Sequence, residues 1–349
     1  MSPFITVISA VLVFGFLIFI HEFGHYLSAR IFNVKINEFS IGMGPRLFYY
    51  DSKKTGIKYS LAAFPIGGFV AMAGEDDESD DPNSFDKKPA WQRFIVTFAG
   101  AAVNIAFGFI AMLLFTSISN IGVGEVVEFV PQEVSGYECS SEDSGLMIGD
   151  VIISVEGKST KLIDEISYEI MRKGTEPVDL VVIRDGKEVE LLDVRFPVIE
   201  ESGQSFGALD FKTRAIKKTF GNVLSFSWRK STLTVRMTWE SIIDLIRGRY
   251  SFAAVSGPVG ISGAIGEAAA AGFASLLYVI VVISINLGIM NLLPIPALDG
   301  GRLLTIIIEM VTRRKLPTKV EGIINTVGLA LLLGLSAVIL VKDVIQIIV

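Results

Sequence analysis

Two histidines and a glutamate lie within the pentapeptide HEFGH at residues 21–25, and the chain of 349 residues has no other histidine. On an α-helix of 3.6 residues per turn, His21 and His25 lie about 40° apart on one face, so both imidazoles can bind one metal ion. Glu22 lies close enough to act on a metal-bound water as a general base. The competing interpretation is a pair of helix histidines satisfied by ordinary hydrogen bonds.

The residues around this pentapeptide are strongly apolar, since residues 16–27 read FLIFIHEFGHYL. Ionisable groups at membrane depth are costly and tend to be functional. Coordination to a metal ion would offset the cost of burying these groups, which favours the metal interpretation over the structural one.

A catalytic zinc ion normally takes three protein ligands and leaves the fourth position to water. No histidine remains, so the third ligand must be a carboxylate or Cys139. Asp299, in NLLPIPALDGGRLL, is the best candidate because it follows an apolar segment and lies among prolines and glycines. Such residues are tolerated at membrane depth where the backbone lines a cavity. A helix N-cap is the alternative role for Asp299, and it is compatible with ligation.

Composition places the chain in the membrane. It is 51% hydrophobic and 19% charged, with a mean hydropathy of +0.55, which is typical of an integral membrane protein. The formal net charge of -6 argues against a nucleic-acid partner. A single cysteine, Cys139, excludes an internal disulfide framework.

Four apolar windows are long enough to cross a bilayer, at residues 4–27, 94–117, 274–293 and 323–341. Lysine and arginine are concentrated in the segments 32–93 and 294–322, which predicts that both segments are cytoplasmic. Both termini and most of 118–273 should then lie outside.

The first cytoplasmic segment has two parts. Residues 38–72 alternate β-branched and aromatic residues with turn signals, which predicts short hairpins near the membrane surface. The acidic run EDDESDD at 75–81 is typical of a solvated linker, and a cation site there has no further support.

Residues 122–198 read as a soluble α+β insert of about 75 residues, with strand-like runs on both sides of the helical stretch LIDEISYEIMRKG. The stretch SGLMIGDVIISVEGKS resembles the PDZ domain, which binds an extended peptide by strand addition. A purely structural module that restricts access to the membrane core is the alternative. Residues 214–249 form an amphipathic pattern that predicts helix on the outer leaflet, or helix packed against the insert.

The predicted fold is therefore a polytopic α-helical membrane protein with about four transmembrane helices, a membrane-associated β-hairpin region and one inserted α+β PDZ-like domain. The predicted divisions are the first transmembrane helix with HEFGH (1–31), the hairpin loop with its acidic linker (32–92), the second transmembrane helix (93–118), the PDZ-like domain (122–200), an amphipathic membrane-surface region (201–272), the third transmembrane helix (273–293), the LDGG segment with a cytoplasmic loop (294–319) and the fourth transmembrane helix (320–347).

These motifs together resemble the site-2 proteases, zinc metalloproteases that cut their substrates within the membrane, in the bacterial RseP-like branch. The resemblance covers nearly the whole chain. It rests on HEFGH, the hairpins ending PIGGFV, AWQRFIVTFAG, the PDZ-like insert, GPVGI at 257–261 and NLLPIPALDGG. Two departures are the sequence AGAAVN, where the family often has a proline after Ala-Gly, and the presence of one PDZ-like module instead of two.

The resemblance implies one Zn²⁺ ion held by His21, His25 and Asp299, with Glu22 as general base. It also implies substrate contacts from Asn286 and Asn291, for which helix-to-helix hydrogen bonding is the alternative. The hairpin around Gly67 and Gly68 would provide a strand edge that pairs with an unwound substrate.

The implied setting is the bacterial cytoplasmic membrane, with the active site near the cytoplasmic side and the PDZ-like domain outside. The implied substrates are single-pass membrane proteins such as anti-sigma factors, or remnant signal peptides. A membrane metal transporter and a non-catalytic PDZ scaffold are the competing functions, and the sequence does not indicate an oligomeric state.

Overall fold

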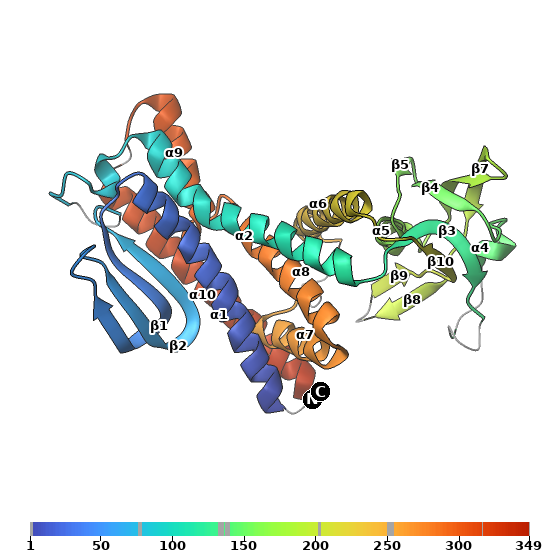
Figure 1. Ribbon diagram of the computed structural model, residues 1–349, viewed down its shortest axis with the longest axis horizontal. Coiled ribbons are helices and arrows are strands. Elements are labelled where there is room, and N and C mark those ends of the chain that lie inside the picture. Colours follow the sequence, from blue (N-terminus) through green and yellow to red (C-terminus); the bar gives the residue numbers. More distant parts are fainter. Residues whose placement is uncertain are drawn as a thin grey trace. The chain divides into compact units, whose positions relative to one another are not determined.

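The computed structural model of the chain describes residues 3–75, 79–131, 136, 140–201, 204–249, 255–315 and 317–348. The chain divides into two compact units, Met1–Ala111 with Val255–Val349, and Met112–Ala254 (Figure 1), and each unit is described by itself. Cys139 and residues 76–78 of the acidic run lie outside the described residues.

Four helices within the described residues are long and apolar enough to cross a membrane, and they span residues 4–31, 90–118, 273–291 and 320–345. They belong to α1 (Pro3–Ile31), α2 (Ala90–Ile118), α8 (Phe273–Asn291) and α10 (Thr318–Ile348). The number of predicted spans is confirmed. Three predicted windows lie inside their observed helices, and the window 274–293 extends two residues beyond its helix. The agreement is close because long apolar runs leave little ambiguity.

Glycines bring α1, α2 and α8 into close contact. A Cβ atom on Gly24 of α1 would lie 2.5 Å from the Ala99 carbonyl oxygen of α2. A Cβ atom on Gly288 of α8 would lie 2.9 Å from the Ala101 carbonyl oxygen, on the same helix α2. Small residues at such crossings are usual in membranes, where helices associate by close packing rather than by excluding water.

The predicted hairpins form a sheet of β1 (Ile36–Asp51) and β2 (Lys58–Met72), beside α1 in Figure 1. The first half of β1, residues 36–41, pairs both with residues 58–61 and with residues 68–72. Within the described pairing, residues 68–72 have a neighbour on one side only, so they form an edge strand. At the far end of the sheet Phe48 and Tyr49 are largely exposed, as expected of a hairpin that contacts the membrane surface.

The remaining helices of this unit are η1 (Phe85–Lys87), α7 (Pro258–Ala271) and α9 (Asp299–Thr312). The GPVGI motif begins α7, and the Asp343 carboxylate of α10 accepts hydrogen bonds from the backbone amides of Gly257 and Gly260 at 3.3 and 3.2 Å. Gly266 of α7 packs directly against Thr6 of α1. Because α7 contacts both the start of α1 and the end of α10, these two helix ends lie on the same side of the unit.

The second unit contains one α+β module, as the sequence predicts. Its main sheet has the order β10-β3-β4-β6-β7, and the short strand β5 pairs with β4 outside this path. Strands β8 and β9 form a separate pair. The elements are β3 (Gly122–Phe129), α4 (Ser140–Asp143), β4 (Val151–Val155), β5 (Lys158–Ser159), α5 (Ile163–Lys173), β6 (Val178–Arg184), β7 (Lys187–Val194), β8 (Val198–Glu201), β9 (Gln204–Gly207) and β10 (Phe211–Ala215). Ile166 and Ile170 of α5 are fully buried against the main sheet, in a core with Ile152 and Leu180.

One predicted division is wrong. Strand β10 pairs with β3, and Phe211 is buried in the module core, so the module extends beyond residue 200. The predicted region 201–272 is not a single region, because β9, β10 and α6 (Phe220–Ile246) belong to the second unit whereas α7 belongs to the first. The sequence FKTRA is short and mostly polar, and its place as a strand is decided by pairing with β3 rather than by its own pattern.

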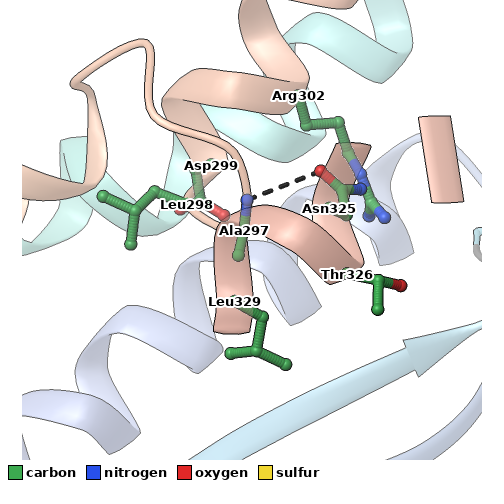
Figure 2. Close-up of a pocket in the computed structure, with 7 residues that line it drawn as sticks. All are labelled: Ala297, Leu298, Asp299, Arg302, Asn325, Thr326 and Leu329. Atoms are coloured by element: carbon green, nitrogen blue, oxygen red, sulfur yellow. Dashed lines mark hydrogen bonds between the residues drawn. The ribbon is translucent and has the colours of Figure 1, made fainter. Parts of the chain in front are cut away.

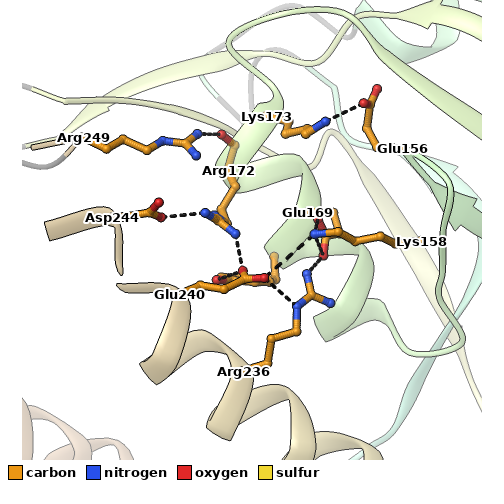
Figure 3. A network of polar contacts seen from close by, with 10 residues as sticks. Glu156, Lys158, Glu169, Arg172, Lys173, Arg236, Glu240, Asp244 and Arg249 are labelled. Atoms are coloured by element: carbon orange, nitrogen blue, oxygen red, sulfur yellow. Dashed lines mark hydrogen bonds and ion pairs between the residues drawn. The ribbon is translucent and has the colours of Figure 1, made fainter. Parts of the chain in front are cut away.

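Helix α6 packs against α5 through ion pairs, some of which Figure 3 shows. Arg172 of α5 binds Glu240 and Asp244 of α6, and Arg236 of α6 binds Glu169 of α5. The sequence left two arrangements open for residues 214–249, the outer leaflet or the insert. One side of α6 packs against the insert. Trp228 and Trp239 of α6 are 61% and 51% exposed, which leaves them available for another contact.

Candidate metal centre

Three side chains converge within the first unit. Nε2 of His21 and Nε2 of His25 lie 3.2 Å apart, and they lie 3.1 and 3.3 Å from Oδ2 of Asp299. Both histidines are buried. The structure thus brings together residues separated by most of the chain, and within the described residues they form the one group of three side chains placed to hold a metal ion.

The outer nitrogen of each imidazole has a partner on α2. Nδ1 of His25 donates to the Val96 carbonyl oxygen at 2.9 Å, which leaves Nε2 as the ligand atom. Nδ1 of His21 lies 3.3 Å from the amide nitrogen of Asn104, whose amide oxygen has no partner within the described residues. With the Asn104 amide in its other orientation, its oxygen accepts the Nδ1 proton of His21. Ligating histidines almost always have such an outer partner.

The donor set fits zinc. A tetrahedral ion with ligands at about 2.0–2.1 Å separates those ligands by about 3.3 Å, close to the spacing of the three atoms here. Oδ2 of Asp299 is buried and has no hydrogen-bond partner within the described residues, although two nitrogens lie near it. Two imidazole nitrogens and one carboxylate oxygen are ligand types that catalytic zinc sites use.

Asp299 is the first residue of α9, and Leu298 is the N-cap, so the N-cap role considered for Asp299 is not observed. A carboxylate in the first helical turn is favoured by the helix dipole. The two glycines that follow are required by packing, since a Cβ on Gly300 or Gly301 would lie 2.1 Å from the Leu293 oxygen or 2.5 Å from the Ile295 oxygen. The LDGG sequence is therefore what allows the chain to turn tightly and begin a helix at the ligand.

Glu22 and the three converging side chains line one cavity of about 330 Å³. The other described residues of its wall are Phe69, Val70, Ala71, Met72, Glu75, Thr97 and Arg302. A Cβ atom on Gly68 would lie 3.2 Å from Cγ of Glu22. The edge strand 68–72 thus runs beside the predicted general base, with no side chain at Gly68 to separate them.

The remaining predicted site residues lie at different distances from this cavity. Asn286 and Asn291 are half-buried on α8 and are not among the described residues of the cavity wall. Gly67 has a φ of +94°, which favours glycine, and it packs against Met43. The structure therefore places Gly68 next to Glu22 but does not bring either asparagine into this wall.

Sequence reasoning missed Gly100. A Cβ atom there would lie 2.3 Å from Nε2 of His25 and 2.9 Å from Cε1 of His21, so glycine leaves the space that both imidazoles occupy. The pattern that could have indicated it is its spacing of four residues from Asn104 on α2, which puts both residues on one helix face.

A second cavity of about 330 Å³ lies on the α10 side of Asp299, and Figure 2 shows its lining residues. Asn325 of α10 accepts a hydrogen bond at 3.5 Å from the backbone amide of Ala297, whose φ is +70°. A Cβ atom on Gly328 would lie 2.4 Å from Cβ of Pro296. Helix α10 thus contacts Pro296 and Ala297, which form the turn that precedes Asp299.

Comparison with known proteins identifies the family of the chain. The family model described as "Peptidase family M50" matches residues 9–335. A protein of Fusobacterium nucleatum named "Putative zinc metalloprotease" is 36% identical over 97% of this chain and 98% of its own length. Similarly named proteins of Clostridium acetobutylicum and Clostridium perfringens are each 33% identical, and the aligned regions cover 98% and 97% of this chain and 98% of each relative. The predicted resemblance to site-2 proteases is confirmed, and the chain belongs to peptidase family M50.

Proposed function

We propose that this peptidase is a zinc-dependent endopeptidase that cleaves single-pass membrane proteins or remnant signal peptides within the membrane. The observation that carries the proposal is the convergence of His21, His25 and Asp299 on one point, with a buried carboxylate oxygen that has no hydrogen-bond partner in the described structure. The names of the relatives, which refer to zinc, support the choice of metal.

His21, His25 and Asp299 would hold the zinc ion, which would supply Lewis-acid chemistry that activates the attacking water. Glu22, on the same cavity wall, accepts the proton of that water and later donates it to the leaving amine. Because both histidines are buried, the electrostatic interactions at the site are stronger than they would be in water.

The edge strand 68–72 is the proposed binding surface for the substrate. Its outer edge can accept an extended peptide by backbone hydrogen bonds, with Gly67 and Gly68 at the end near Glu22. A substrate helix must be unwound before its peptide bonds can be attacked, and pairing with a strand compensates for its lost hydrogen bonds. We assign Asn286 and Asn291 to contacts with the substrate backbone farther along α8.

The proposed setting is the bacterial cytoplasmic membrane, with both chain ends and the PDZ-like module outside. From Thr6, near the outer end of α1, to His21 is 15 residues, or about 22 Å along the helix. In a hydrocarbon core of about 30 Å the site would then lie toward the cytoplasmic side. The module would screen or recognise substrates already shortened outside, and Trp228 and Trp239 would contact the outer leaflet.

The test compares the wild-type protein with Glu22→Gln in proteoliposomes that contain a transmembrane substrate. The variant should bind one zinc ion per chain and lose at least about 100-fold in cleavage rate, because the general base is absent. Cleavage at the wild-type rate would overturn the assigned mechanism. Metal flux without cleavage in the same vesicles would favour a transporter, and a peptide-binding protein without stoichiometric zinc would favour a scaffold.

A further inference from the structure

An ion pair joins the two halves of the candidate site. Arg302 of α9 binds the Glu75 carboxylate, and both side chains line the same cavity as Glu22. Arg302 follows Asp299 by three residues, about one helical turn, and Glu75 follows the edge strand by three residues. Their side chains are only 17% and 18% exposed, so the pair is largely shielded from water.

Glu75 also binds the last residue of the edge strand. Its Oε2 accepts a hydrogen bond at 3.3 Å from the backbone amide of Met72, while Oε1 accepts from Arg302. One carboxylate therefore contacts both the last residue of β2 and the first turn of α9. This contact also shows that Glu75, predicted as the start of a solvated linker, belongs to the folded site.

One other described connection between the edge strand and α9 is apolar, because Val70, Met72 and Ile306 belong to one buried cluster. Residues 68–72 pair with residues 36–41 on one side only, and nothing in that pairing involves α9. Asp299 itself contacts His21 and His25 of α1, and the ion pair of Glu309 with Arg93 of α2 lies ten residues beyond Asp299, about 15 Å along the helix. The pair of Glu75 with Arg302 is thus the described ion pair that joins the residues after the edge strand to α9.

We propose that Arg302 and Glu75 are positioning residues that fix the edge strand relative to Asp299, and so select which substrate peptide bond meets Glu22. This inference rests on the proposed function, in which the substrate pairs with residues 68–72. A paired strand that slips by two residues moves by about 6.8 Å, which would present a different peptide bond to the site. A slip of one residue would turn every side chain to the opposite face.

The experiment uses the full chain in proteoliposomes, with Glu75→Arg, Arg302→Glu and the combined charge swap. Each single variant should lose at least about 10-fold in kcat/KM, mainly through KM, because two like charges replace a shielded pair. Mass spectrometry should show cleavage at several neighbouring bonds instead of one. The combined swap should restore most of the rate and the single cleavage position.

Milder variants cover the case in which a reversed charge prevents folding. Glu75→Gln and Arg302→Gln should fold, bind one zinc ion per chain and still broaden the cleavage positions. A binding readout uses Glu22→Gln, Cys139→Ser protein with Ala71→Cys on the edge strand and a substrate that carries single cysteines. Glu75→Gln should spread the disulfide crosslinks over several substrate positions, and this readout does not depend on turnover.

The matched control is the pair Arg93 with Glu309, which also ties α9 to a neighbouring element but lies outside the cavity wall. Swapping its charges should leave the cleavage position unchanged. The inference is overturned if the wild-type protein cleaves but the Glu75 and Arg302 variants, folded and zinc-loaded, cut at the same single bond with unchanged KM. Failure of the wild-type protein itself to cleave, with zinc bound, would instead contradict the proposed function.

Discussion

Two clusters of ionisable side chains in the described structure are built in opposite ways. In the network between α5 and α6, Glu169 is bound by Lys158 and Arg236, and Arg172 is bound by Glu240 and Asp244. Each charge there is neutralised by another side chain of the same unit. In the metal centre, by contrast, the Asp299 oxygen faces two imidazoles and has no hydrogen-bond partner within the described residues.

The residue types follow the same division. Arginine and lysine carry permanent charges, so the buried carboxylates of the network between α5 and α6 have cationic partners from the chain itself. An imidazole that has lost its proton offers a lone pair to a metal ion, so the site in the first unit suits an added cation. A buried charged group that is paired with other side chains of the chain has a structural role. A buried charged group that faces other potential metal ligands indicates a binding site.

The largest effect should come from Asp299→Asn, which keeps the shape of the side chain but removes its charge. Zinc affinity should fall by more than the roughly 10- to 100-fold typical of outer-shell partners, because a direct ligand is weakened. Competition with a fluorescent chelator measures the affinity. Wild-type zinc affinity in this variant would break the comparison, since the open carboxylate would then not be a ligand.

Gly100→Ala tests whether zinc binding at the metal centre depends on the space around the imidazoles as well as on charge. The added methyl group would collide with His25, and overpacking of this kind costs about 1–3 kcal/mol, or roughly a 5- to 150-fold loss in zinc affinity. Gly263→Ala is the control, because nothing lies within 4 Å of its Cβ position on α7. Equal zinc affinity in both variants would show that the imidazoles can move aside.

Glu169→Gln removes a charge from the network between α5 and α6, as Asp299→Asn does in the metal centre. Glu169 is buried, but its partners Lys158 and Arg236 are partly exposed, so water can replace part of the lost interaction. We expect a local loss of about 1–2 kcal/mol. Hydrogen exchange of α5 and α6 amides should accelerate roughly 5- to 30-fold, with zinc affinity unchanged. A loss of zinc without faster exchange would contradict the division between the two clusters.

Acidification should give the smallest effect near neutral pH, and it should act on the network between α5 and α6. Burial alone would raise the pKa of Glu240, but hydrogen bonds from Tyr168 and Arg236 and the nearby Arg172 hold it below its usual value. Its contribution to stability is therefore complete above about pH 5 and is lost as the pH falls through the lowered pKa of the folded state.

In a Trp91→Phe background, the fluorescence of Trp228 and Trp239 on α6 provides the measurement for this pH effect. The signal should be constant from pH 8 to about pH 5 and should change only below the ordinary glutamate pKa near 4.5. Glu240→Gln should remove part of that acid transition. A transition centred near pH 6 would point to a histidine, and neither histidine of this chain lies in the second unit.

The sequence was sufficient where physical constraints are local. HEFGH fixes its own geometry through the helical period, and the apolar runs fix the spans through their length. The sequence was insufficient where pairing partners decide. FKTRA forms strand β10 because it pairs with β3. Glu75, which was predicted to lie in a solvated linker, is part of the folded site because it binds Arg302. Gly100 has no chemistry of its own, so its importance is visible only when the imidazoles are placed beside it.

The wide separation of the ligands along the chain has a consequence for biosynthesis. His25 precedes Asp299 by 274 residues. At about 5–20 residues per second, synthesis of that interval takes roughly 14–55 s. During this time the first span is in the membrane with an incomplete ligand set, and the unfinished chain has no active centre. The ligand set is complete only after the third apolar segment and LDGG have been synthesised, so the fragment that is still being translated lacks Asp299.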